Sequence, residues 1–273
     1  MDDKLRDLAP PPAIQQAMSY LYFDESIRDK GDFIVGALVL ADFDLSKGVT
    51  DLWLAMGIDP TLAEFKSSGF KVADSKGRHQ RSALRGLLQS LQLAFVVCPR
   101  SDRRRLGMHL TSLVHQLLDR GLLMVGKHDL HVDQNISVSA SAKASLAVRG
   151  VVANVNQDSR VASGIQVADY AAHSLGGMLL EEMGIAAKKV PLDEGSGHES
   201  TAEIELGFEL WAGLRFAILG KNEDVPGHSI PGDPVNPFFN VDGYGLYIAP
   251  SCSESLASAA RGRFGVNYLG CIH

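Results

Sequence analysis

Two apolar segments near the start of the chain constrain the fold most strongly. Met18–Phe23 (MSYLYF) and Phe33–Ala41 (FIVGALVLA) are rich in aromatic and β-branched side chains, which is typical of buried strands. The polar stretch Asp29–Asp32 (DKGD) between them is typical of a tight turn. Together they predict a buried β-hairpin.

Helical and strand patterns alternate after the hairpin. Further strands are predicted at 93–98, 130–133 and 151–155, and helices at 45–56, 63–70, 78–91, 102–122, 140–147, 164–180 and 202–219. A hairpin followed by such alternation predicts an α/β fold with a mixed sheet flanked by helices. We expect an N-terminal tail at 1–17, the α/β domain at 18–185, and a helical and loop-rich C-terminal extension at 186–273.

The composition is that of an ordinary globular protein, with 45% hydrophobic and 21% charged residues in a chain of 273. Its three cysteines are far apart and form no CxxC pair, which argues against a disulfide framework or a zinc ribbon. The acidic start has no apolar signal-peptide core, and the apolar stretch Val161–Leu180 contains Asp169. We therefore expect a cytoplasmic protein without a membrane span.

The charge is distributed unevenly along the chain. The net charge is −6, yet residues 66–127 contain 12 Lys/Arg against 3 Asp/Glu, a local charge of +9. The densest part is Arg103, Arg104 and Arg105. Such a block is either a solvated helix face or a surface that contacts phosphates, and it makes nucleic acid the expected partner.

Three aspartates occur in apolar surroundings where an ionised carboxylate is costly. Asp24 and Asp133 each end a predicted strand, and Asp169 lies inside the predicted helix 164–180. Each alone is explained by a capping or hydrogen-bonding role. Three on separate core elements indicate a shared cation, since buried carboxylates are normally paired or bound to metal.

Glu64, just before the basic block, is a fourth candidate, although a glutamate in the first turn of a helix is common. Glu25 follows Asp24, and strand alternation predicts that its side chain points to the opposite face. Oxygen ligands without cysteine favour Mg²⁺ or Mn²⁺ over zinc. P-loop, GxGxxG, HExxH and GxSxG signatures are absent from the sequence.

The order of these residues resembles the family known as domain of unknown function 3800. The resemblance covers about residues 18–180 and rests on YLYFDES at 20–26 with the strand that follows, on EFK at 64–66, HVD at 131–133, DS at 158–159 and GIQVAD at 164–169. One departure is Ile27, where the family usually has glycine after Asp-Glu-Ser. The resemblance implies a ribonuclease H-like fold, related to integrases and Holliday-junction resolvases.

The resemblance also implies a metal-dependent nuclease in which Asp24, Glu64, Asp133 and Asp169 are the catalytic and metal-binding acids. In such sites two ions about 4 Å apart activate a water and stabilise the leaving oxygen of a phosphodiester. Lys66 either contacts the phosphate or pairs with an acid. We expect the remaining roles as follows: substrate binding by Lys66, Arg103, Arg104 and Arg105, and support of the ligands by Glu25, Gln166, His131 and His173.

Two other interpretations remain open. A metal hydrolase could use His128, His131 and Asp133, although the two histidines, three residues apart, would point to opposite faces of a strand. Alternatively, the chain is a non-catalytic module that keeps the ribonuclease H-like fold and binds nucleic acid or protein. The C-terminal extension is a candidate for wrapping the domain or for homo-oligomerisation, because its aromatic side chains would be costly if left exposed.

Overall fold

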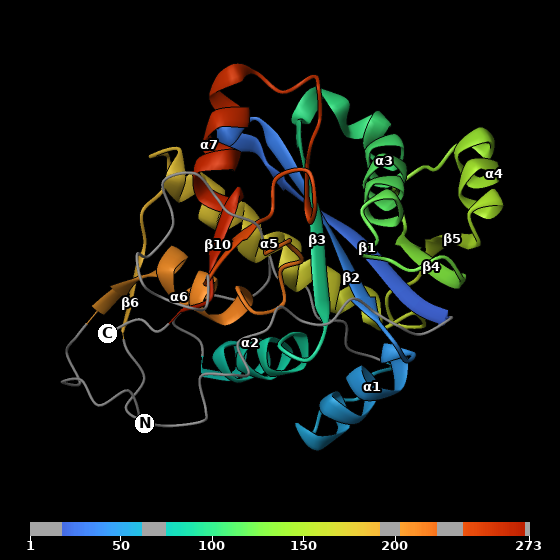
Figure 1. Ribbon diagram of the computed structural model, residues 1–273. Helices are drawn as coiled ribbons and strands as arrows, with labels where there is room; N and C mark the ends of the chain where they lie inside the picture. The colour runs from blue at the N-terminus through green and yellow to red at the C-terminus, as the bar shows by residue number, and fades with distance from the viewer. Residues whose placement is uncertain (1–17, 62–74, 192–202, 223–236, 271–273) are drawn as a thin grey trace, which may run out of the picture.

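A six-stranded mixed sheet forms the centre of the protein (Figure 1), in the strand order β5-β4-β1-β2-β3-β9. This computed structural model describes residues 18–61, 75–191, 203–222 and 237–270. The strands of the sheet are β1 (Met18–Arg28), β2 (Phe33–Ala41), β3 (Gln92–Pro99), β4 (Lys127–Asp133), β5 (Val151–Gln157) and β9 (Leu246–Ile248).

The sheet is mixed, with antiparallel pairs in the hairpin region and parallel pairs where helices connect the strands. The strand β2 pairs antiparallel with both β1 and β3, with Tyr20 opposite Ala41 and Arg28 opposite Phe33 in the hairpin. The crossover strands β4 and β5 run parallel to β1. The expected α/β class is confirmed, and the arrangement is consistent with a ribonuclease H-like fold. Asp24 and Asp133 lie on the adjacent strands β1 and β4.

Helices cover both faces of the sheet (Figure 1). They are α1 (Leu45–Ala55), α2 (Ser75–Leu88), α3 (Leu106–Asp119), α4 (Ala140–Val148), α5 (Gly164–Glu182), α6 (Leu206–Leu214) and α7 (Glu254–Phe264). One apolar cluster lies between the sheet and α3, and the other between the sheet and α5. Alternate side chains of β1 enter different clusters, since Tyr22 belongs to the α5 side and Phe23 to the α3 side.

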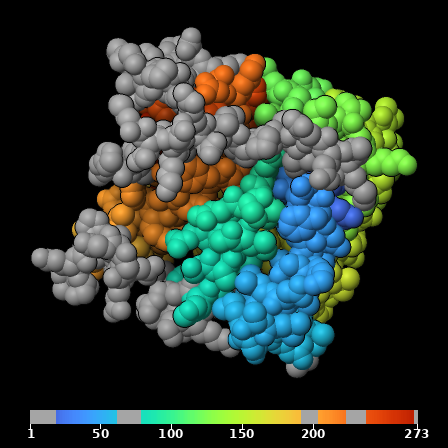
Figure 2. All heavy atoms as spheres, turned by 60° about the horizontal axis from the view of Figure 1, so that its bottom comes forward, coloured from blue at the N-terminus to red at the C-terminus, as the bar shows by residue number. Residues whose placement is uncertain are grey.

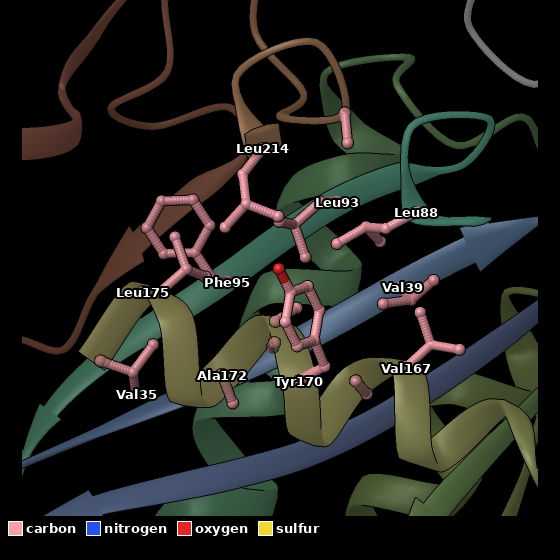
Figure 3. Packing of buried hydrophobic residues seen from close by; sticks show 14 of the residues in the cluster. Val35, Val39, Leu88, Leu93, Phe95, Val167, Tyr170, Ala172, Leu175 and Leu214 are labelled. Carbon is pink, nitrogen blue, oxygen red and sulfur yellow. The ribbon is translucent and has the colours of Figure 1, made fainter. Parts of the chain in front are cut away.

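The α5 side holds the larger of the two clusters. Figure 3 shows side chains of α5, including Val167, Tyr170 and Leu175, against side chains of the sheet such as Val39 and Phe95. The helices α1, α2 and α6 also contribute to this cluster, and Figure 2 shows them along one face of the molecule. Apolar residues on α5 at helical spacing therefore fix this helix along the central strands.

Two predicted helices differ from the structure at their beginnings. The helix expected at 102–122 starts as a 3₁₀ segment, η4 (Arg100–Arg105), because the Asp102 side chain turns inward and is buried. The helix expected at 202–219 is shorter and follows the strand β7 (Glu203–Glu205), which pairs with β6 (Lys189–Pro191). A partner strand brought close only by folding explains the second difference.

The C-terminal residues from 237 to 270 contain more regular structure than their prolines and loops suggest. The strand β9 adds to the sheet beside β3, and α7 packs on the α5-side cluster. We did not predict α7, although Ser253 caps it by accepting a hydrogen bond from the Leu256 N–H. The expected boundary at residue 186 stays a prediction. None of the helices in the described ranges is long and apolar enough to cross a membrane.

Candidate metal centre

Three carboxylates converge where β4 ends beside β1. The parallel ladder between these strands finishes at the pair Phe23 and Val132, and the next residues are Asp24 and Asp133. Asp24, Asp133 and Glu25 each offer one carboxylate oxygen, and these three oxygens lie within 4.8 Å of one another. Within the described ranges this is the one group of three or more potential ligands with metal-site spacing.

The inclusion of Glu25 corrects the sequence analysis. Strand alternation predicted that Glu25 would point away from a site at Asp24, whereas its carboxylate joins the same group. The partner strand explains the difference. The strand β4 ends at Asp133, whereas β1 continues to Arg28, and its residues after Phe23 pair with β2. A glutamate is also one methylene longer than an aspartate, so it can reach around the strand end.

The electrostatics of the group are unfavourable without a cation. Burial raises the pKa of Asp24 well above its usual value, and the charges of Asp133, Asp169 and Glu25 raise it further. Burial and the charge of Asp133 also raise the pKa of Glu25. One oxygen of Glu25 is buried and accepts no hydrogen bond from any described residue. Crowded acids with an unsatisfied buried oxygen are expected at a site that binds a cation.

Asp169 lies next to this group without belonging to the set of three. It is half-buried on α5, and its charge contributes to the raised pKa of Asp24. The helix positions it because Gly164, at the first turn, sits against the Tyr22 ring, where an added Cβ would come within 2.5 Å of a ring carbon. A larger residue at this position would push α5 and Asp169 away from β1.

Glu64 and Lys66 lie outside the described residues, so their predicted roles stay predictions. The arginines 103, 104 and 105 are exposed on η4. Arg103 lies close enough to Glu25 for its charge to oppose the raised pKa of that carboxyl. The arginine-rich part of the basic segment therefore lies near the carboxylates, while Arg105 lies 3.8 Å from the buried Asp102.

His131 and His173, two of the residues expected to support the ligands, are uncharged neighbours of the site. His131 stacks on Tyr22 with the ring centroids 5.2 Å apart, and burial lowers the pKa of its imidazole. Burial, together with Arg28 and other cations, lowers the pKa of His173 to about 4. Neither ring is one of the three converging groups, so each can shape the surroundings of the carboxylates while remaining neutral.

Gln166, the third of these residues, connects α5 to the rest of the core. Its side-chain oxygen accepts a hydrogen bond from the Trp53 indole at 2.9 Å, and its amide donates to the Ser159 carbonyl at 2.8 Å. These two hydrogen bonds hold the beginning of α5 in place.

His128 does not support the alternative of a histidine-containing metal triad. It pairs with Ser19 near the beginning of β4, and its ring lies 2.7 Å from the Met124 carbonyl oxygen. His131 and Asp133 are further along the strand, on the side of the carboxylate group. The three residues therefore do not share one site.

Sequence reasoning missed two features near the site. One is Arg28. It lies four residues after Asp24 in the same strand, so strand alternation already indicated that both side chains share one face. The other is Asp102, which accepts hydrogen bonds from His109, at 2.9 Å, and from Ser251 of the C-terminal segment. Nothing in the sequence indicated that Ser251 would meet η4, because the two are separated by almost 150 residues.

No family model matches the chain, and no curated protein matches it. Among solved structures, a chain of the complex of PCNA with RNase HII from Archaeoglobus fulgidus is similar over 70% of this chain and 84% of that chain, with 16% sequence identity and a TM-score of 0.37. We take the fold from the strand order and directions described above.

Proposed function

We propose that this protein is a divalent-metal-dependent nuclease that hydrolyses phosphodiester bonds in nucleic acid, and that it is a divergent relative of the domain of unknown function 3800 family. The observation that carries the proposal is the convergence of Asp24, Glu25 and Asp133 on the central parallel strands of a ribonuclease H-like sheet. Buried acids that repel one another destabilise a fold unless a bound cation neutralises their charges.

The donor set fits a hard cation. Asp24, Glu25 and Asp133 would hold Mg²⁺ or Mn²⁺ through carboxylate oxygens, with Asp169 beside them and Glu64 as a further candidate. When bound, such a cation lowers the pKa of a coordinated water and neutralises charge on a phosphate. The raised pKa values of Asp24 and Glu25 mean that a cation must displace protons from these groups, so binding is expected to strengthen as the pH rises.

The chain's own cations would bring the substrate to this site. A negatively charged backbone is repelled by the three converging acids and by Asp169 beside them, and exposed arginines nearby offset that repulsion. Arg103 and Arg104 on η4 are exposed, and Arg103 is within electrostatic reach of Glu25. We assign them contacts to phosphates near the cleaved bond. Such contacts position a strand without reading its sequence.

Cleavage assays with single- and double-stranded DNA and RNA test the proposal. Protein treated with EDTA is expected to be inactive, and Mg²⁺ or Mn²⁺ is expected to restore cleavage. Asp24→Asn and Asp133→Asn should remove this activity, because each deletes a ligand charge and keeps the side-chain shape. The matched control is Asp51→Asn on α1, an exposed aspartate that pairs with Lys47. Cleavage by Asp24→Asn at the wild-type rate would contradict the proposal.

The non-catalytic alternative predicts a different result in the same experiment. In that case the protein binds nucleic acid with a strong salt dependence but cleaves no substrate with either metal. Calorimetric titration with Mn²⁺ also distinguishes the nuclease from the non-catalytic module, because a module without catalytic activity is not expected to bind the ion.

A further inference from the structure

The stripe of α5 that faces β1 contacts the strand at two glycines, and a third close approach lies just beyond the end of β1. Gly164 meets Tyr22, and a Cβ on Gly176 would lie 2.5 Å from Nε of Arg28. Near the end of the hairpin, a Cβ on Gly31 would lie 3.0 Å from a methyl carbon of Leu180. The helix and the strand therefore run side by side in the same direction over this length.

Asp169 and His173 lie between these contacts on the same stripe, four residues apart. The charge of Asp169 acts on Asp24 and also on Arg28. The Arg28 guanidinium donates a hydrogen bond to the main-chain carbonyl oxygen of His173, one turn after Asp169. Asp169 therefore lies within electrostatic range of both the acidic group and the Arg28 guanidinium.

Arg28 occupies a position where an arginine is costly. Its side chain is mostly buried, and burial lowers its pKa, while the charge of Asp169 acts in the opposite direction. Its Nε is buried and donates no hydrogen bond to any described residue. A buried guanidinium is stable only beside a compensating negative charge. The acids of the site supply that charge, and the missing Cβ at Gly176 leaves room for the guanidinium.

We propose that Arg28 is a positioning residue that acts as a permanent counter-ion within the metal centre, neutralising Asp169 and fixing α5 on β1. This inference rests on the proposed function, because it assigns Arg28 a role toward the metal ligands. The cation then needs to balance chiefly the group formed by Asp24, Glu25 and Asp133. In the metal-free protein, Arg28 limits the repulsion between Asp169 and that group.

Removal of the Arg28 charge should change how strongly Mn²⁺ stabilises the protein, which the loss of packing alone would not do. Arg28→Met keeps most of the apolar side-chain length and removes the charge, so the metal-free protein should melt about 3–6 °C lower. The repulsion that is left uncompensated strengthens the attraction for a cation. Saturating Mn²⁺ should therefore raise the melting temperature of Arg28→Met by more than it raises that of the wild type. Arg28→Lys, which keeps the charge, should recover most of the difference.

A double-mutant cycle tests the pairing without any metal. If Arg28 neutralises Asp169, Arg28→Met in an Asp169→Asn background should lower the melting temperature by clearly less than it does in the wild type. Arg149→Met is the matched control, since Arg149 pairs with the exposed Asp119 far from the site. It should change neither the Mn²⁺ response nor the cycle.

The outcomes separate this inference from the proposed function. An Mn²⁺ response in the wild type that is lost in Asp24→Asn but unchanged in Arg28→Met would overturn the role of Arg28 alone. Additive effects of Arg28→Met and Asp169→Asn in EDTA would overturn it too. No Mn²⁺ response in the wild type would contradict the proposed metal centre, whereas coupling in the metal-free cycle would still establish the Arg28–Asp169 pair.

Discussion

Asp24 and Asp133 immediately follow the last residue pair of the parallel ladder between β1 and β4. Their carboxylates meet at a point where one strand continues and the other stops, and Glu25 joins them there. Parallel strands place their carboxyl ends at one edge of a sheet, which is where ligand sites of α/β proteins commonly lie. The fold thus brings three acids together at a sheet edge where a bound cation would neutralise their charges.

Asp24→Asn should leave the metal-free protein as stable as the wild type or more stable. The substitution keeps the shape of the side chain and removes one of several repelling charges from a mostly buried position. Thermal melts in EDTA and in Mn²⁺ measure this, and the stabilisation by Mn²⁺ should shrink in the variant. A marked loss of stability in EDTA would indicate a structural role for Asp24 instead.

The same variant predicts a pH dependence. The pKa of Asp24 is raised in the folded protein above its ordinary value of 3.8, so the folded state holds this proton more tightly than the unfolded state. Its contribution to the free energy of unfolding is therefore highest at acidic pH and falls as the pH rises toward the folded pKa. The advantage of Asp24→Asn over wild type in EDTA should accordingly grow with pH. Urea unfolding at several pH values measures it, and a constant difference would contradict the raised pKa.

Glu25→Gln should weaken Mn²⁺ binding even though Glu25 was first expected to point away from the site. It removes one of the three converging carboxylates. Calorimetric titration should give a weaker affinity for this variant and an unchanged one for Glu203→Gln, whose glutamate is exposed on β7. Equal affinities for Glu25→Gln and wild type would exclude Glu25 as a ligand and favour Glu64 in its place.

Charge reversal of Arg103 and Arg104 should weaken nucleic-acid binding for all sequences to a similar extent. If each arginine contacts one phosphate, the slope of log affinity against log salt should lose about 2 in magnitude. Fluorescence anisotropy at several salt concentrations measures this with duplexes of unrelated sequence. Salt-independent binding would show that η4 is a solvated surface without phosphate contacts.

Asp102→Ala should behave in the opposite way to Asp24→Asn. Although burial disfavours its charge, hydrogen bonds from Ser251 and His109 lower the pKa of Asp102, so this acid is satisfied in the folded protein. Its removal leaves the buried His109 without this partner and should cost about 1–3 kcal/mol. Chemical denaturation measures the loss, and an unchanged free energy of unfolding would contradict this network.

Local patterns determined the elements that the sequence analysis placed correctly. The hairpin strands and α5 are long apolar segments, and β4 alternates buried with more exposed side chains, so these patterns reflect which side chains are buried. The three aspartates were recognisable because an acid next to an apolar run is costly. These properties depend on neighbours within a few residues, so a sequence displays them.

Only the tertiary structure decided which distant residues meet. Glu25 joins the carboxylates beside the end of β4, and α5 lies close to β1 because Gly164 and Gly176 leave room for Tyr22 and Arg28. The β9 strand and Ser251 join the core through contacts with β3 and η4 far away in the chain. Such contacts are set by strand register and by the packing of whole elements, which local residue patterns do not encode.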